Sequence, residues 1–97
     1  MTNQEKAELI RPWVNPNERI TVDFTDVQGL NALVEGCTEN VVHLTFQETF
    51  PHLKERITVP LRIVTVDEDP YHYTRDPRHT IQNRLRLHVE QNQPEGL

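Results

Sequence analysis

The stretch that decides the fold is Val-Val-His-Leu-Thr-Phe at residues 41–46, read together with Ile-Thr-Val-Pro-Leu-Arg-Ile-Val-Thr-Val at residues 57–66. Both runs are rich in β-branched residues, which favour strands. In the first run, Val42, Leu44 and Phe46 alternate with more polar residues, as in a strand with one buried face. The two runs therefore predict a small β-rich domain.

Alternation of apolar and polar residues predicts three more strands, at residues 18–26, 30–37 and 81–90. The strand that contains the second run extends over residues 56–66 and is the longest. Pro60 cannot donate to a strand ladder, so this position must lie at a sheet edge or at a bulge. The inward side chains expected from these patterns include Ile20, Val22, Phe24, Leu30, Ala32, Val34, Ile57, Val59, Leu61, Ile63, Leu85, Leu87 and Val89.

A short helix is predicted before the strands, at residues 2–11. Thr2 can cap it, and Glu5 follows at the spacing of a capping box. Pro12 ends it, because the residue before a proline avoids the helical conformation. So short a helix is not stable alone; it either frays or docks on the sheet, with Leu9, Ile10 and Trp13 as its expected anchors.

These elements predict one domain. Residues 1–90 form it, and residues 91–97, which show no periodicity, form a disordered tail. Short antiparallel strands can bury a core when their sheet curls on itself, which also removes exposed edges. We therefore expect an all-β fold with one short helix, built as a small five-stranded antiparallel barrel. The alternative is an open antiparallel sheet with the helix packed on one face, an α+β arrangement.

The composition limits the partners. The net charge is −5, and residues 1–50 contain three basic and eight acidic side chains. An acidic chain argues against non-specific binding to nucleic acid, so no DNA partner is expected. No apolar run is long enough to cross a bilayer, and no signal peptide is recognisable. We expect a cytoplasmic protein without membrane contact, whose only cysteine, Cys37, is a small buried residue.

The order of elements, Gly29 and the segment Asn-Val-Val-His-Leu at residues 40–44 resemble the Sm-like family of small SH3-like barrels. The resemblance covers roughly residues 2–46. In that family a loop asparagine contacts RNA bases, and Asn40 stands at the matching position. The family's second motif, an apolar residue followed by Arg-Gly, is missing here. The resemblance thus implies an SH3/Sm-like fold, with Asn40 as the RNA-contacting residue if the function is shared.

A long polar stretch at residues 67–80 is a candidate contact loop, because loops of this length are often functional. Its acidic residues could instead make it a solvated loop without a ligand. The candidate partner-binding or anion-binding residues in it are Tyr71, His72, Tyr73, Arg75 and Arg78.

A second candidate site is the row formed by Arg84, Arg86 and His88, which share one face of the last predicted strand. The arginine fork matches both phosphates and carboxylates. Under the RNA hypothesis, Arg84 and Arg86 act together with Asn40. The alternative is that these arginines pair with acids on neighbouring strands, such as Asp23.

Catalysis is not expected. The chain has no serine, and its five histidines lack the helical spacing of a zinc motif. We therefore predict no catalytic residue, no metal site and no cofactor. The function expected is a non-enzymatic interaction module that binds a protein partner, or itself as a homo-oligomer, through a strand edge or residues 67–80. The alternative is an Sm-like RNA-binding barrel, whose affinity must fall steeply with salt.

Overall fold

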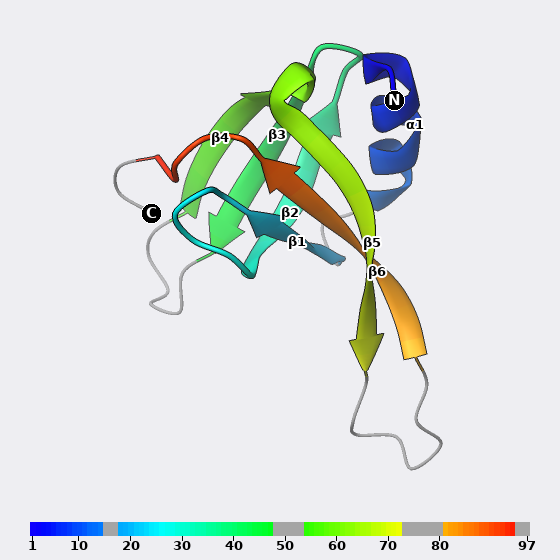
Figure 1. Cartoon of the computed structure of the whole chain (residues 1–97), viewed down its shortest axis with the longest axis vertical. Helices are drawn as coiled ribbons and strands as arrows, with labels where there is room; N and C mark the ends of the chain where they lie inside the picture. Colours follow the sequence, from blue (N-terminus) through cyan, green and yellow to red (C-terminus); the bar gives the residue numbers. More distant parts are fainter. Residues whose placement is uncertain (15–17, 48–53, 73–80, 95–97) are drawn as a thin grey trace.

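The computed structural model describes residues 1–14, 18–47, 54–72 and 81–94. One α-helix, two short 3-10 helices and six strands make up this part of the chain (Figure 1). In chain order they are α1 (Asn3–Ile10), η1 (Arg11–Trp13), β1 (Arg19–Asp23), β2 (Leu30–Cys37), β3 (Val41–Gln47), β4 (Lys54–Pro60), η2 (Leu61–Ile63), β5 (Val64–His72) and β6 (Ile81–Val89).

The strands form one open mixed sheet in the order β4-β3-β2-β1-β6-β5. Four neighbouring pairs are antiparallel, whereas β1 and β6 are parallel, with Val22 opposite Leu87. The β5–β6 hairpin is the longest pair, and its far end extends past the rest of the sheet (Figure 1). The predictions of a closed five-stranded barrel, of an SH3/Sm-like architecture and of an all-antiparallel sheet are therefore wrong.

Strand direction explains why the sheet stays open. Because β6 is parallel to β1, alternation along the order makes β4 and β5 run in the same direction. These two strands are joined only by the three residues of η2. A parallel pair needs a crossover of a dozen or more residues. No ladder between β4 and β5 can therefore close the sheet, although η2 holds their adjoining ends together.

The longest predicted strand, at residues 56–66, is in fact broken after Pro60. Residues 61–63 form η2, and the chain resumes as β5, which continues through His72. The first part of the predicted loop at residues 67–80 is thus strand, and residues 73–80 lie outside the described part of the chain. Pro60 ends β4 at the sheet edge, as the prediction for this proline requires.

The helix forms where the capping box predicts it. The Glu5 N–H donates to Thr2 Oγ1, and the Thr2 N–H donates to Glu5 Oε1, both at 3.2 Å. Pro12 lies in η1, so the α-helix gives way to a single 3-10 turn. Ala7 and Ile10 are fully buried, and α1 contacts β2, β5 and η2.

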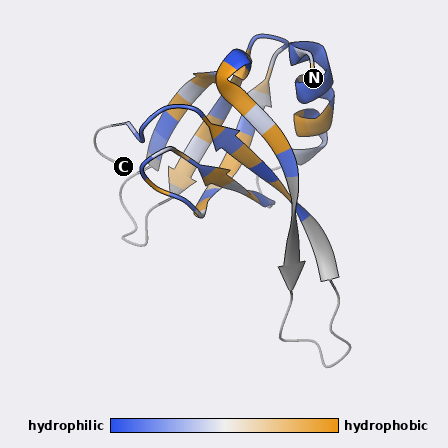
Figure 2. Ribbon diagram, in the orientation of Figure 1, coloured by the Kyte–Doolittle hydropathy of each residue, from blue (hydrophilic) through white to orange (hydrophobic). Residues whose placement is uncertain are grey.

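The core lies between the inner face of the sheet and α1. Hydrophobic and hydrophilic residues alternate along the strands (Figure 2), and the predicted inward residues of β1, β3 and β6 are all buried. Phe24 and Phe46 are in ring contact, with centroids 5.9 Å apart. The buried apolar residues are Ala7, Ile10, Ile20, Val22, Phe24, Ala32, Val34, Val42, Leu44, Phe46, Val59, Leu61, Val64, Leu85, Leu87 and Val89.

Candidate functional site

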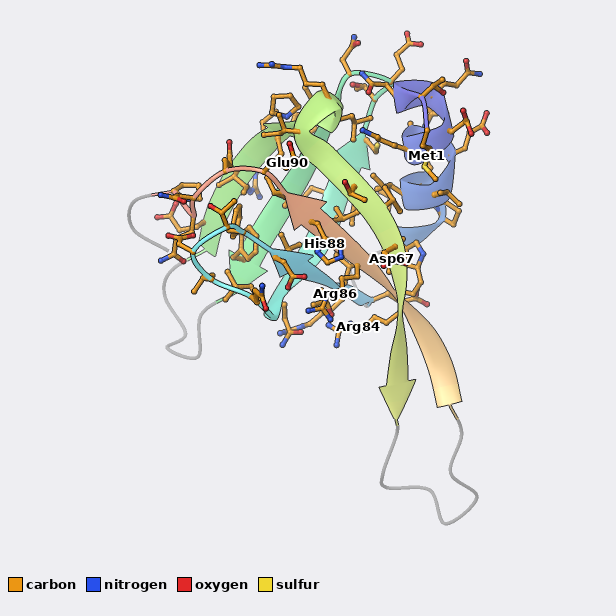
Figure 3. All side chains as sticks on the ribbon, in the orientation of Figure 1. Met1, Asp67, Arg84, Arg86, His88 and Glu90 are labelled. Carbon is orange, nitrogen blue, oxygen red and sulfur yellow. The ribbon has the colours of Figure 1, made fainter. Side chains whose placement is uncertain are left out.

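The row of polar residues predicted on β6 lies on the outer face of the sheet. Arg84, Arg86 and His88 follow one another along the strand, and Asp67 lies on the adjacent strand β5 (Figure 3). The parallel register places Asp23 of β1 opposite His88. The sheet therefore brings two carboxylates next to the predicted arginine row.

Asp23 is the centre of this cluster and is only 4% exposed. Arg86 Nε donates to Asp23 Oδ2 at 2.7 Å, and a terminal nitrogen of Arg86 donates to Oδ1 at 3.0 Å. The Gly29 N–H donates to Oδ1 at 2.8 Å. Burial by itself would raise the pKa of Asp23, but the hydrogen bonds from Arg86 and Gly29, with the charges of Arg86 and His88, outweigh it and hold the pKa below its usual value.

His88 lies between two acids. Its Nδ1 is 3.0 Å from Asp23 Oδ2, and its Nε2 is 4.0 Å from Asp67 Oδ2. Arg86 and His88 thus contact the same buried carboxylate from neighbouring positions of β6. The predicted alternative, that the arginines pair with an acid such as Asp23, holds for Arg86.

Arg84 has a different role in the sheet. The β1–β6 ladder begins at Thr21 opposite Arg86, and Arg84 lies just before it. Arg84 Nε donates to the Arg19 carbonyl at 3.0 Å, and a terminal nitrogen reaches Asn31 Oδ1 at 2.7 Å. Arg84 therefore ties β6 to β1 and β2 where the ladder stops.

The other predicted contact residues are not brought to this row. Asn40 lies in the turn after β2, and its carbonyl accepts from the Leu61 N–H of η2. Val64, next to η2, pairs with Val89 of β6. Arg84 is five residues from Val89 on the same strand, so it lies about 17 Å from this end of β6 at the usual strand rise. Of the predicted loop residues, Tyr71 and His72 lie in β5 opposite Gln82 and Ile81, while Tyr73, Arg75 and Arg78 lie outside the described residues.

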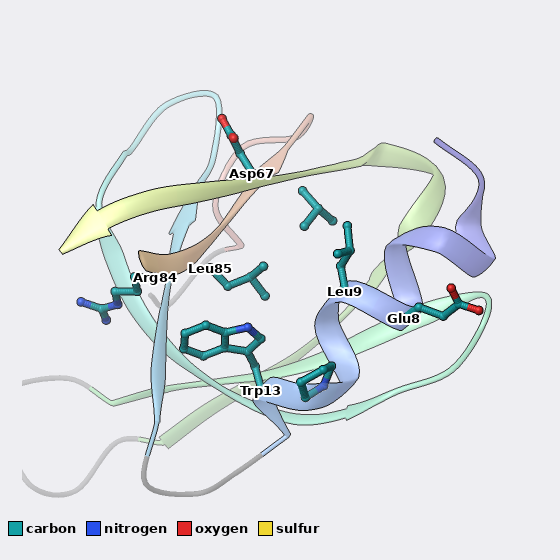
Figure 4. A pocket seen from close by; sticks show the side chains of 8 residues that line it. Glu8, Leu9, Trp13, Asp67, Arg84 and Leu85 are labelled. Carbon is teal, nitrogen blue, oxygen red and sulfur yellow. The ribbon is translucent and has the colours of Figure 1, made fainter. Parts of the chain in front are cut away.

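A groove opens beside Trp13, between the end of α1 and the β5–β6 pair (Figure 4). Its volume is about 360 Å³. Apolar side chains from both sides line it, namely Leu9, Pro12, Trp13, Val66 and Leu85. Glu8, Asp67 and Arg84 line its charged parts.

The short length of α1 explains why this groove is not filled by the helix. The eight residues of α1 span about 12 Å at the usual helix rise. The nine residues of β5 span about 30 Å. The helix is therefore too short to cover the whole inner face of the sheet. Trp13 of η1 lies at the end of the part that is covered.

Two of the groove residues, Leu9 and Trp13, were expected to anchor the helix. Leu9 is instead 45% exposed, whereas Trp13 is half-buried and packs against the core. Glu8, Val66 and Leu85 could not be assigned to a groove from the sequence, because only the β5–β6 register and the docking of α1 bring them together. The available signal in the sequence was a leucine, Leu9, four residues before the only tryptophan, Trp13.

A second, more polar hollow of about 310 Å³ lies over β3 and β4 and is lined by Glu35, His43, Arg56 and Thr58, among others. The side chains here bond to each other. Thr45 Oγ1 donates to Glu35 Oε1 at 2.8 Å, and His43 Nδ1 lies 2.8 Å from Thr58 Oγ1. This hollow therefore offers fewer unsatisfied polar groups than its residue types suggest.

Cys37, at the end of β2, is partly buried. Burial raises the pKa of its thiol above the usual value, against the smaller opposing effect of the Arg11 charge. A protonated thiol is a poor nucleophile. Among the described residues, no three His, Cys, Asp or Glu side chains gather into a group that could hold a metal ion.

No helix in the described ranges is long and apolar enough to cross a membrane. Comparison of the chain with protein-family models, curated protein sequences and solved structures gives no match to any of them.

Proposed function

We propose that this protein is a non-enzymatic interaction module that binds a short segment of a partner protein in the groove beside Trp13. The observation that carries the proposal is the groove itself, about 360 Å³ in volume and lined by apolar side chains from a helix and a strand pair. Grooves of this kind take up the anchoring side chains of partner segments. Leu9 supports the proposal because it is apolar, lines the groove and is 45% exposed.

The environments of Asp23 and Cys37 favour binding over catalysis. The Asp23 carboxylate accepts hydrogen bonds from Arg86 and Gly29, and a raised pKa keeps the Cys37 thiol protonated. Neither group has the pairing of nucleophile and base that catalysis needs. We also place this module in the cytoplasm, a location that the lone cysteine supports because disulfide frameworks belong to oxidising compartments.

RNA binding has less support. Arg84 donates to backbone and side-chain oxygens of neighbouring strands, and Arg86 is bound to Asp23. Asn40 lies at the other end of the sheet, next to η2. The three residues of the RNA hypothesis therefore do not form one surface.

The test is a selection of binding segments from a displayed library of random peptides. Selected segments are then measured against two variants of the full chain, Leu9→Asp and Val14→Asp. Both residues are exposed and apolar, but only Leu9 lines the groove.

We expect Leu9→Asp to weaken binding at least ~10-fold, because a charge then replaces part of the apolar lining. Val14→Asp should bind as the unmodified chain does. A library that yields no binding segment, or segments that bind both variants equally well, would rule out the groove as the binding site.

A further inference from the structure

We propose that two copies of this chain pair through their β4 strands and form a dimer with one continuous sheet. This inference goes beyond the proposed function, because the groove beside Trp13 is lined from α1, η1, β5 and β6. Strand β4 stands at one end of the strand order, and β3 is its only strand partner in the described part of the chain. Its other edge is therefore a place where a further strand can add to the sheet.

The β3–β4 register shows which backbone groups of β4 point away from β3. The Leu61 N–H donates to the Asn40 carbonyl at 2.9 Å, and the ladder continues with Pro60 opposite Val41. Antiparallel strands alternate between pairs that exchange hydrogen bonds and pairs that do not. The odd-numbered residues of β4 therefore bond to β3, and the even-numbered residues direct their N–H and C=O groups toward the open edge.

Two observations agree with this assignment. Pro60 is an even-numbered residue, so its missing N–H takes nothing from the ladder with β3. His43 lies opposite Thr58, and His43 Nδ1 is 2.8 Å from Thr58 Oγ1. Side chains lie closest in the pairs that do not exchange hydrogen bonds. The backbone groups of Arg56 and Thr58 therefore point toward the open edge.

One antiparallel register fits two β4 strands best, namely the one that places Ile57 opposite Ile57 of the second copy. It uses the whole length of β4. Arg56 then forms a hydrogen-bonded pair with Thr58 of the second copy, and the backbone of Lys54 lies opposite that of Pro60. By symmetry the two copies exchange about six backbone hydrogen bonds. A register centred on Arg56 would instead set two arginines directly opposite each other, which destabilises a strand pair.

Ile57 gives this pairing an apolar centre. Its side chain is half-buried, lies opposite Leu44 and packs against the core. In the proposed register the two Ile57 residues form a pair without hydrogen bonds, so their side chains lie close together. Each then removes apolar surface of the other from water, which favours association.

The other edge of the sheet is less suited to such pairing. Strand β5 carries Pro70 within the strand, where a proline removes a donor and hinders the addition of a further strand. Strand β4 has its only proline at its last residue, Pro60. Because both copies use the same β4 edge about a two-fold axis, no β4 edge remains for a third copy, and the assembly closes as a dimer.

The test is analytical ultracentrifugation of the full chain over a range of concentrations, with urea unfolding to verify that each variant is folded. Thr58→Lys sets a lysine opposite Arg56 of the second copy in both halves of the dimer. The double variant Arg56→Glu/Thr58→Lys turns the same pairs into opposite charges. Both variants lose the contact of Thr58 with His43, so this loss cannot explain a difference between them. The matched control is Thr65→Lys, because Thr65 is an exposed threonine on the other edge strand, β5.

We expect the unmodified chain to form a reversible dimer. Thr58→Lys should raise the dissociation constant about 3- to 10-fold, and the double variant should bring it back to that of the unmodified chain or lower. Thr65→Lys should leave it unchanged. The backbone amides of Arg56 and Thr58 should exchange hydrogen more slowly as the concentration rises, because in the dimer they donate to the second copy.

A chain that stays monomeric at millimolar concentration would overturn the inference. A dimer that Thr65→Lys weakens as much as Thr58→Lys, or that the double variant does not restore, would overturn it as well. So would amide exchange at Arg56 and Thr58 that does not depend on concentration. None of these results bears on the groove, whose test uses Leu9→Asp and a bound segment, so the two proposals fail separately.

Discussion

At the scale of single residues, Asp23 ties two strands and a turn together. Its carboxylate joins β1 to β6 through Arg86 and His88 and holds the turn before β2 through the Gly29 N–H. The sequence pattern put Asp23 on the outward face and suggested an arginine partner. Its burial could not be predicted, because the cover comes from residues that only the parallel β1–β6 register brings above it.

Replacement of Asp23 by asparagine should lower the free energy of unfolding by about 2 kcal/mol at neutral pH, because a buried ion pair loses one partner. The pKa of Asp23 is lowered in the folded state. Its contribution is therefore present above about pH 4, where an ordinary aspartate is ionised, and is lost as the pH falls through the lowered pKa. Urea unfolding of both proteins between neutral and acidic pH measures the effect.

The matched control is Glu39→Gln, which removes one acidic charge at an exposed position. It should leave the urea midpoint nearly unchanged. Asp23→Asn should also make the decrease in the free energy of unfolding toward acidic pH less steep. Two results would show that the Asp23 cluster does not stabilise the fold. One is equal stability of the two variants, and the other is the same loss of stability at acidic pH in Asp23→Asn as in the unmodified chain.

Gly29 provides a second residue-scale prediction. Its φ of +76° lies in the left-handed region, and an added Cβ would meet nothing within 4 Å. Gly29→Ala should therefore cost about 1 kcal/mol through backbone strain alone. Gly36→Ala is the control, because its Cβ would make only an ordinary contact at 3.7 Å with His43. A thermal melt in which Gly36→Ala lost as much stability as Gly29→Ala would contradict this account.

At the scale of elements, the helix and most strands could be predicted from the sequence. The bounds of β2 and β3 match the alternation of apolar residues, and the capping box of α1 forms at Thr2 and Glu5. The strand after Pro60 could not be placed correctly. The apolar run continues from β4 through η2 into β5, so nothing in its hydropathy marks the corner except the proline.

The cap of α1 gives a prediction at this scale. Thr2→Ala should lower stability by about 1 kcal/mol, because the Glu5 N–H loses its acceptor at the helix start. Thr2→Ser keeps the hydroxyl and should behave as the unmodified chain does. Urea unfolding distinguishes the two variants. Equal stability of the alanine and serine variants would mean that the capping box does not help to hold α1 on the sheet.

At the scale of the whole molecule, the sequence predicted a β-rich chain with one docked helix but not its topology. The alternation of residues in each strand shows which side chains face inward. It does not show which strands are neighbours or in which direction they run. The pairing of β1 with β6 joins segments far apart in the chain, and its parallel sense fixes β4 and β5 in one direction. The open sheet follows from this pairing, and the groove follows from the open sheet and the short helix.

The most direct test of the central claim is to map on the folded chain where a selected segment binds. The measurement is a two-dimensional nitrogen–proton NMR spectrum recorded with and without the segment. We expect the largest shifts at the Trp13 indole N–H and at the backbone amides of Leu9, Val66 and Leu85, which line the groove. Shifts confined to β4 or to the turn at Asn40 would contradict the claim that the groove beside Trp13 is the binding site.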